Sequence, residues 1–126
     1  MNIIHTDDAP AAIGPYSQAI THGGMVYTSG QVALRPGTTG LIGQTAAEQA
    51  RVALENLSAV LTAAGSSLSH AVKVSVFLAD MNDFPEVNAV YAEAFGEHRP
   101  ARSTVEVSRL PVDALVEIDC IAAVIS

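Results

Sequence analysis

The stretch Val72-Lys73-Val74-Ser75-Val76-Phe77-Leu78 has the pattern of a strand that enters the middle of a sheet. Apolar and polar residues alternate in its first half, and its second half is continuously apolar. Helical patterns flank this strand on both sides. The preceding helix begins at Thr45-Ala46-Ala47-Glu48, a capping box in which the threonine and glutamate side chains satisfy free backbone amides, and it ends at Gly65.

The following helix begins at Asp83, with Pro85 in its first turn, and ends at Gly96. Each helix carries a single apolar stripe, which predicts that it packs on one side only. The stripe of the second helix is typical of core packing rather than of a ligand-binding surface. It consists of Val87, Val90, Tyr91, Ala94 and Phe95.

Further strands are predicted towards both ends of the chain. Residues 25–29 follow the turn pair Gly23-Gly24, and we expect them to form a hairpin with residues 16–20. Residues 101–108 and 114–125 form two more strands, joined by a turn. The order strand, strand, helix, strand, helix, strand, strand predicts an α+β fold, with one mainly antiparallel sheet and two helices packed on one face.

The last predicted strand has two different faces. One face is uniformly apolar, while the other begins with Glu117 and Asp119 and continues with Ile121, Ala123 and Ile125. A uniformly solvated surface would not change character halfway along a strand. We therefore expect the side of the sheet without helices to form a contact between subunits.

The composition supports self-association. The 126 residues are expected to form one domain, residues 1–126, in which 49% of residues are hydrophobic and 15% are charged. Such a chain has too few charges to cover a small sphere, so we expect a closed homo-oligomer. The net charge of −7 argues against a nucleic-acid partner, because that class of protein presents a basic face to phosphates.

Neither a membrane location nor a metal site is expected. The amino terminus has no signal-peptide pattern and no apolar run is long enough to span a membrane, so we expect a cytoplasmic protein. Cys120 is the single cysteine and lies in an apolar run, which predicts a buried small hydrophobe. The four histidines are dispersed along the chain, so no metal ligands are predicted.

Arg102 is the first candidate for a functional residue. The chain has only six Lys plus Arg against thirteen Asp plus Glu, and Arg102 lies within a strand. A guanidinium group binds carboxylates and phosphates through two parallel hydrogen bonds, which indicates a small anionic ligand. The alternative is an arginine on the solvated face of an edge strand.

Glu117 is the second candidate. Arg102 and Glu117 lie on successive strands joined by a turn, so they can come near the same point of a hairpin. They are either a surface ion pair or a site in which the guanidinium binds a small organic acid and the carboxylate holds and partly deprotonates a water molecule. Tyr16 and Ser29 are further candidates, with a half-buried strand residue and a polar strand end as the alternatives. No histidine is placed to activate a serine nucleophile.

Several motifs together resemble one known family, the RidA (YjgF) family of reactive intermediate deaminases. The resemblance extends in order over about residues 9–124 and so covers nearly the whole chain. The motifs are Gly14-Pro15-Tyr16-Ser17-Gln18-Ala19, Thr28-Ser29-Gly30-Gln31, Asp83-Phe84 with Val87-Asn88, Pro100-Ala101-Arg102-Ser103, Val105-Glu106-Val107, and Leu110-Pro111 before Glu117-Ile118.

The resemblance implies a chorismate-mutase-like α+β protomer and a homotrimer with sites in the clefts between subunits. It also implies hydrolysis of 2-imino acids or their enamine tautomers, such as 2-iminobutanoate and 2-iminopropanoate, to 2-keto acids and ammonia, without a cofactor. Arg102 would then bind the substrate carboxylate and Glu117 would position the attacking water. The other residues expected to line the pocket are Tyr16, Ser29, Gly30, Asn88 and the backbone around Thr104.

Two departures from the family pattern bear on the substrate. Thr104 stands where archetypal members carry cysteine, and the segment Glu97-His98-Arg99 is shorter than in the archetype. The preferred substrate side chain is therefore left open. Two other functions also stay open: an endoribonuclease or translation inhibitor, as attributed to some relatives, and a non-catalytic trimer that binds keto acids.

Overall fold

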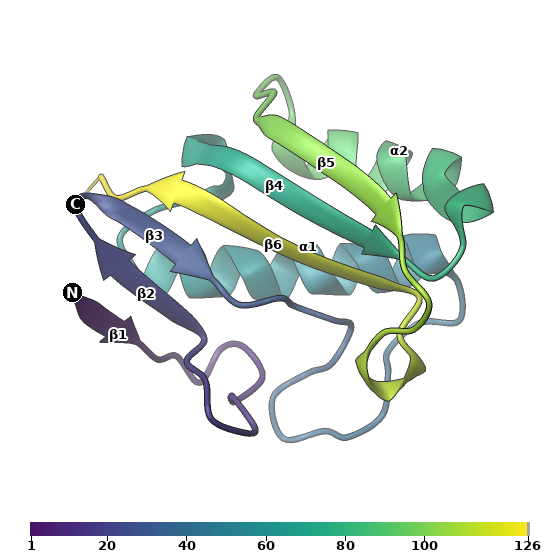
Figure 1. Ribbon diagram of the computed structural model, residues 1–126, viewed down its shortest axis with the longest axis horizontal. Helices are drawn as coiled ribbons and strands as arrows, with labels where there is room; N and C mark the ends of the chain where they lie inside the picture. Colours follow the sequence, from purple (N-terminus) through teal and green to yellow (C-terminus); the bar gives the residue numbers. More distant parts are fainter. Residues whose placement is uncertain (126) are drawn as a thin grey trace.

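Six strands form one sheet, and two α-helices lie side by side on one of its faces in the computed structural model, which describes residues 1–125 (Figure 1). The strands are β1 (Asn2–Ile4), β2 (Ala19–His22), β3 (Met25–Thr28), β4 (Ala71–Leu78), β5 (Ala101–Glu106) and β6 (Val116–Ala123). The helices are α1 (Ala46–Ala63) and α2 (Phe84–Phe95), with short 3-10 turns η1 (Leu68–His70), η2 (Met81–Asp83) and η3 (Pro111–Asp113).

The strand order is β1-β2-β3-β6-β4-β5, and only the β4–β5 pair is parallel. The predicted α+β fold, with a mainly antiparallel sheet and helices on one face, is confirmed. The hairpin predicted before the first helix is also confirmed, although its strands are β2 and β3 and Tyr16 lies outside them. Strand β1 was not predicted, because three residues give too short a pattern to recognise.

The predicted hairpin between the last two strands is wrong, because β4 lies between β5 and β6. β5 follows β4 through the α2 crossover, which is the usual connection between parallel strands. Burial explains the order. One face of β6 is fully apolar and needs a central position, whereas the side chains of β5 are almost all exposed and tolerate the edge of the sheet.

The two helices begin and end close to their predicted residues. The hydroxyl of Thr45 accepts a hydrogen bond from the Glu48 amide at 3.1 Å, which is one half of the predicted capping box, whereas the Glu48 carboxylate accepts from the Thr45 hydroxyl instead of its backbone amide. Gly65 and Gly96 follow the two helices with positive φ angles of 79° and 62°. Of the predicted α2 stripe, Ala94 is exposed and the other four members are buried.

The core lies between the helices and one face of the sheet. It includes Leu57 and Leu61 of α1, Val74 and Leu78 of β4, and Ile118 of β6, all essentially inaccessible to solvent. Cys120 lies in this core as predicted, and its burial raises the pKa of the thiol to about 12. No helix within residues 1–125 combines the length and the hydrophobicity needed to cross a membrane.

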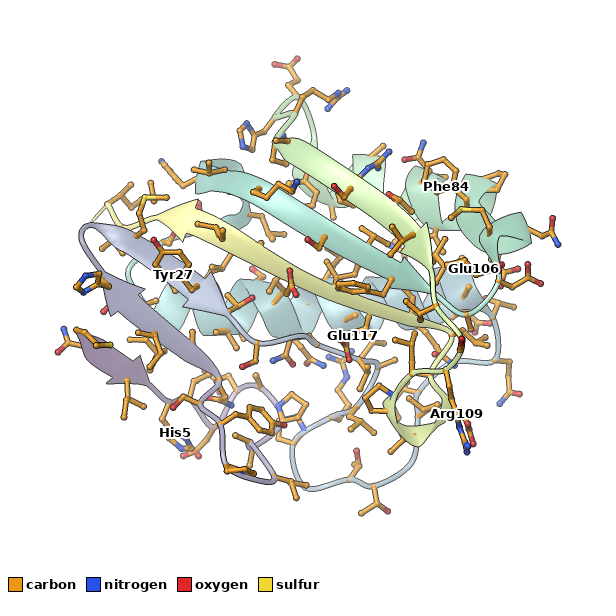
Figure 2. The ribbon with its side chains drawn as sticks, viewed as in Figure 1. His5, Tyr27, Phe84, Glu106, Arg109 and Glu117 are labelled. Carbon is orange, nitrogen blue, oxygen red and sulfur yellow. The ribbon has the colours of Figure 1, made fainter. Side chains whose placement is uncertain are left out.

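The face of the sheet without helices, called the open face below, is partly apolar. In the register, Ile3, Ile20, Tyr27 and Ile121 form one row across four strands. Tyr27 is labelled on this face in Figure 2, and it remains 43% exposed. The expected subunit contact on this face stays a prediction.

Candidate active site

Arg102 lies on the same face of the sheet as the helices. In the parallel β4–β5 register it is aligned with the buried Val74, so both side chains point towards the helix layer. The centre of its guanidinium lies 4.7 Å from the Tyr91 ring centroid and 5.3 Å from that of Phe84. Its Nη1 donates a hydrogen bond of 2.7 Å to Oδ1 of Asn88.

The helix α2 presents these three partners together. Phe84, Asn88 and Tyr91 are spaced four and three residues apart, so they lie on one face of the helix. Their approach to Arg102 places aromatic faces and one amide oxygen around the cation, an arrangement that favours a fixed guanidinium. A cavity of about 510 Å³ is lined here by Asn88, Tyr91, Arg102 and residues of the segment before β5. We call Phe84, Asn88, Tyr91 and Arg102 the arginine half-site.

Arg102 has no carboxylate partner within residues 1–125. The ion pairs in this part of the chain are His5–Asp7, Arg35–Glu55, Arg51–Glu93 and Arg109–Asp113. The charge of Arg102 is therefore balanced only by the Asn88 oxygen and the two ring faces. A guanidinium group that has no carboxylate partner keeps N–H donors available for an external anion.

Glu117 lies on the open face, because it alternates with the buried Val116 and Ile118 along β6. Its side chain packs directly against Gly30. A Cβ atom at position 30 would lie 2.5 Å from Oε2 of Glu117 and 2.6 Å from its Cδ, so any larger residue there would displace the Glu117 side chain. Two backbone hydrogen bonds between Gln31 and Ile118, of 2.8 and 3.0 Å, hold this segment against β6.

Tyr16 and Ser29 belong to the loops around Glu117. Tyr16, Gly30 and Glu117 line one cavity of about 580 Å³. The Ser29 hydroxyl does not line it; it donates a 2.5 Å hydrogen bond to the Ser17 carbonyl and so ties the Tyr16 loop to the end of β3. We call Tyr16, Ser29, Gly30 and Glu117 the carboxylate half-site; Glu117 is labelled in Figure 2.

The electrostatics of the open face favour a protonatable carboxylate. Burial raises the pKa of Glu117, and the nearby charge of Asp119 raises it further. Burial also raises the pKa of Asp119, against the opposing effect of a hydrogen bond from Ser75. A carboxylate with a raised pKa is a better proton acceptor than an ordinary one.

Thr104 points towards the helix layer, two residues along β5 from Arg102, and it lines neither cavity. Its hydroxyl is buried without a hydrogen-bond partner within residues 1–125, and the same holds for the hydroxyl of Tyr91. Among these residues no group of three His, Cys, Asp or Glu side chains could hold a metal ion.

The two half-sites lie on opposite faces of the sheet. Arg102 is aligned through Val74 with Cys120, whereas Glu117 is aligned with Phe77 and lies three residues before Cys120 in β6. One protomer therefore separates the cation from the carboxylate, contrary to the hairpin expectation. The structure brings Asn88 to Arg102, and Tyr16 and Gly30 to Glu117.

Three residues of these surroundings were not predicted: Tyr91, Phe84 and Asp119. Tyr91 was assigned to the core stripe, and its burial agrees with that assignment although its ring also faces Arg102. Phe84, Asn88 and Tyr91 are spaced so that they share one helix face, and this spacing was the available signal for Phe84 and Tyr91. The alternation of β6 was the signal for Asp119, which shares a face with Glu117.

Comparison with known proteins gives consistent results. Residues 6–124 match the family model described as endoribonuclease L-PSP. The chain is 52% identical over 120 residues to a RutC family protein of Pyrococcus horikoshii, covering 95% of each chain. It is 50% identical over 122 residues to the 2-iminobutanoate/2-iminopropanoate deaminase of Salmonella typhimurium, covering 94% of each.

A solved structure of E. coli TdcF with bound serine has the same fold as this chain. The TM-score is 0.92 at 45% sequence identity, and the match covers 98% of each chain. Both the family model and these relatives span nearly all of the sequence, as the motif resemblance does. The chain therefore belongs to the endoribonuclease L-PSP family, which is the RidA (YjgF) family that its motifs resemble.

Proposed function

We propose that this protein hydrolyses 2-imino acids and their enamine tautomers, such as 2-iminobutanoate and 2-iminopropanoate, to 2-keto acids and ammonia. The observation that carries the proposal is the guanidinium of Arg102, which is fixed by Asn88, Tyr91 and Phe84 and has no carboxylate partner within residues 1–125. The name of the Salmonella typhimurium relative supports the reaction.

The chemistry requires little more than the two half-sites supply. Arg102 binds the substrate carboxylate through paired hydrogen bonds. Glu117 accepts a proton from a water molecule, whose oxygen attacks the electrophilic C2 of the imine while the imine nitrogen gains a proton. The resulting carbinolamine loses ammonia and leaves the keto acid. Correct placement of the reactants lowers such a barrier by up to about 7–11 kcal/mol when the reacting atoms are well aligned.

A site of this kind needs two protomers, because Arg102 and Glu117 lie on opposite faces of the sheet. We propose a homotrimer in which the arginine half-site of one protomer meets the carboxylate half-site of the next. Such head-to-tail contacts close into a ring, and the ring contains as many sites as subunits. The partly apolar open face is the surface that this assembly would bury.

The assay generates 2-iminopropanoate or 2-iminobutanoate in situ and measures the appearance of the keto acid, with the wild type and with Arg102→Ala. We expect the wild type to accelerate hydrolysis and the variant to lose about 10²- to 10³-fold in kcat/KM, because a charge-assisted bidentate contact disappears. No acceleration by the wild type would refute the proposal. Light scattering at micromolar concentration tests the assembly, and a monomeric mass would contradict the composite site.

The family name favours a second candidate, an endoribonuclease. The net charge of −7 argues against it, because phosphate binding depends on basic surfaces. RNA cleavage that survives complete repurification and persists in Arg102→Ala would support this candidate. A non-catalytic keto-acid-binding trimer is tested by Glu117→Gln: loss of turnover with retained keto-acid binding supports the enzyme.

A further inference from the structure

Three loops meet beside Glu117 and form the wall of the 580 Å³ cavity. They precede β2, follow β3 and precede β6, and Figure 1 shows all three below the end of the sheet. Their contribution to the wall is mostly apolar. The apolar members with the largest side chains are Pro10, Ile13, Val32, Leu34, Pro111 and Val112.

Among residues 1–125, only two charged side chains line this cavity, Glu117 and Arg35. Arg35 already forms an ion pair with Glu55, with 2.9 Å between Nη2 and Oε1. The cavity therefore offers no unpaired cation to a second anionic group, and the Glu117 carboxylate would repel one. The arginine half-site differs, because its guanidinium lacks such a partner within residues 1–125.

Val112 contributes to this wall at an energetic cost. Its φ and ψ angles are 52° and 25°, in the left-handed region that β-branched residues rarely adopt. Such a conformation costs about 1–3 kcal/mol. Packing in the core does not compensate for this strain, since Val112 remains 54% exposed. An exposed apolar side chain in a strained turn beside a candidate catalytic carboxylate favours a role in ligand contact.

The substrate's geometry tells which of its groups would reach Val112. The C2 atom of a 2-imino acid carries a carboxylate, a nitrogen and a side chain. In the proposed function the carboxylate binds Arg102 and the water held by Glu117 attacks C2. The side chain is then the remaining substituent large enough to extend along the loops around Glu117, where the apolar wall lies.

We propose that Val112, together with Ile13 and Leu34, forms the side-chain subsite and makes the enzyme select 2-imino acids with apolar side chains over those with a second carboxylate. This inference rests on the proposed function. Val112 is its specificity-determining residue, because it is the only member of the three with a strained backbone. An apolar contact of this size changes kcat/KM by about 10-fold or more.

The test compares imines formed in situ from leucine, alanine and aspartate by the matching flavin amino-acid oxidases. In the wild type we expect kcat/KM for the leucine-derived imine to exceed that for the aspartate-derived imine by at least about 10-fold. In Val112→Asn this ratio should fall several-fold. Asparagine tolerates the left-handed conformation, so the change alters the polarity of the wall without adding strain.

Asp113→Asn is the matched control. Asp113 also has a positive φ, of 56°, but it does not line the cavity. Asparagine at this position should leave the leucine-to-aspartate ratio at its wild-type value. A similar fall in both variants would overturn the proposal, since it would show that the turn conformation rather than the wall of the cavity sets the preference.

Two further outcomes separate this inference from the proposed function. Hydrolysis of the alanine-derived imine with an unchanged ratio in Val112→Asn would overturn the subsite alone. Failure to hydrolyse any imine would overturn both. Calorimetric binding of 4-methyl-2-oxopentanoate and 2-oxobutanedioate, the corresponding keto acids, gives a readout without turnover. Val112→Asn should weaken the first interaction, and equal binding of the two acids by the wild type would contradict the proposal.

Discussion

The arginine half-site and the carboxylate half-site are built in different ways. The first stands on regular elements, since α2 supplies Asn88 and Tyr91 and strand β5 supplies Arg102. The second combines one strand residue, Glu117, with two loop segments, of which that at Gln31 is bound to β6 by backbone hydrogen bonds and that of Tyr16 is bound to Ser29. The proposed function thus assigns binding of the substrate carboxylate to a part built on regular elements and the proton acceptor to a part built largely of loops.

The separation follows from the alternation of side chains in a sheet. Arg102 is aligned with the helix-facing Val74, while Glu117 is aligned with Phe77 of the open face. A shift by one residue would reverse the face of either side chain, so the register fixes the separation. In the proposed function, a site that uses both groups therefore takes one of them from a second protomer.

The largest expected effect comes from mixing two inactive variants. Arg102→Ala and Glu117→Gln should each lose at least about 10²-fold in kcat/KM, through loss of the carboxylate contact and of the proton acceptor. After joint unfolding and refolding at equal amounts, activity should return to about a quarter of the wild-type value, because random assembly pairs an intact Arg102 with an intact Glu117 at that frequency.

The control for this experiment mixes Arg102→Ala with the double variant, which offers no intact arginine half-site. This mixture should stay inactive. A lack of recovery when the two single variants are mixed would contradict the composite site, provided that mass measurements show mixed assemblies.

Gly30→Ala should disturb the carboxylate half-site alone. The new methyl group would lie 2.5 Å from Oε2 of Glu117 and would force that carboxylate to move. Displacement by about 1 Å costs about 10²-fold in rate, so kcat should fall while keto-acid binding changes little. Gly40→Ala is the control, because nothing lies within 4 Å of a Cβ atom there. Equal activities of the two variants would show that the Gly30–Glu117 contact has no role.

The sequence predicted the positions of the helices and strands better than the pairing of the strands. The capping box and the terminal glycines located both helices, because these signals act over a few residues. The pairing of strands depends on burial in the whole sheet. Because one face of β6 is apolar, β6 lies in the centre of the sheet between β3 and β4, and it does not pair with β5 as the predicted hairpin required. The same error placed Arg102 beside Glu117.

The candidate site was predicted in the same uneven manner. Asn88 was expected from the family motif to line the pocket, and the structure places it in a 2.7 Å hydrogen bond with Arg102; its role in ligand binding stays a prediction. Tyr91 was expected only in the core, since an apolar helical stripe does not tell whether one of its rings also faces a cation.

Tyr91 should contribute a moderate effect in the arginine half-site. Tyr91→Leu removes the ring that lies 4.7 Å from the guanidinium, and a cation–π contact of about 0.5–2 kcal/mol corresponds to a rise in KM of about 2- to 30-fold. The change in kcat should be smaller, because the residue positions Arg102 without reaching the reacting atoms. Tyr91→Phe keeps the ring and removes a hydroxyl without a partner in residues 1–125, so its KM should stay near the wild-type value. A KM equally raised in both variants would contradict the role of the ring.

The smallest expected effect is a shift of the pH profile in the carboxylate half-site. In the proposed function Glu117 acts as a base when it is ionised, so the rate should fall as the pH drops through its folded-state pKa, which burial and the charge of Asp119 raise. Asp119→Asn removes that charge, lowers the pKa of Glu117 and should move the acidic limb of the kcat profile to lower pH. Asp113→Asn removes an exposed carboxylate that is paired with Arg109 and has no part in raising the pKa of Glu117, so it should leave the limb in place. If Asp119→Asn left the limb unmoved or moved it to higher pH, Glu117 would not be the group whose ionisation limits the rate.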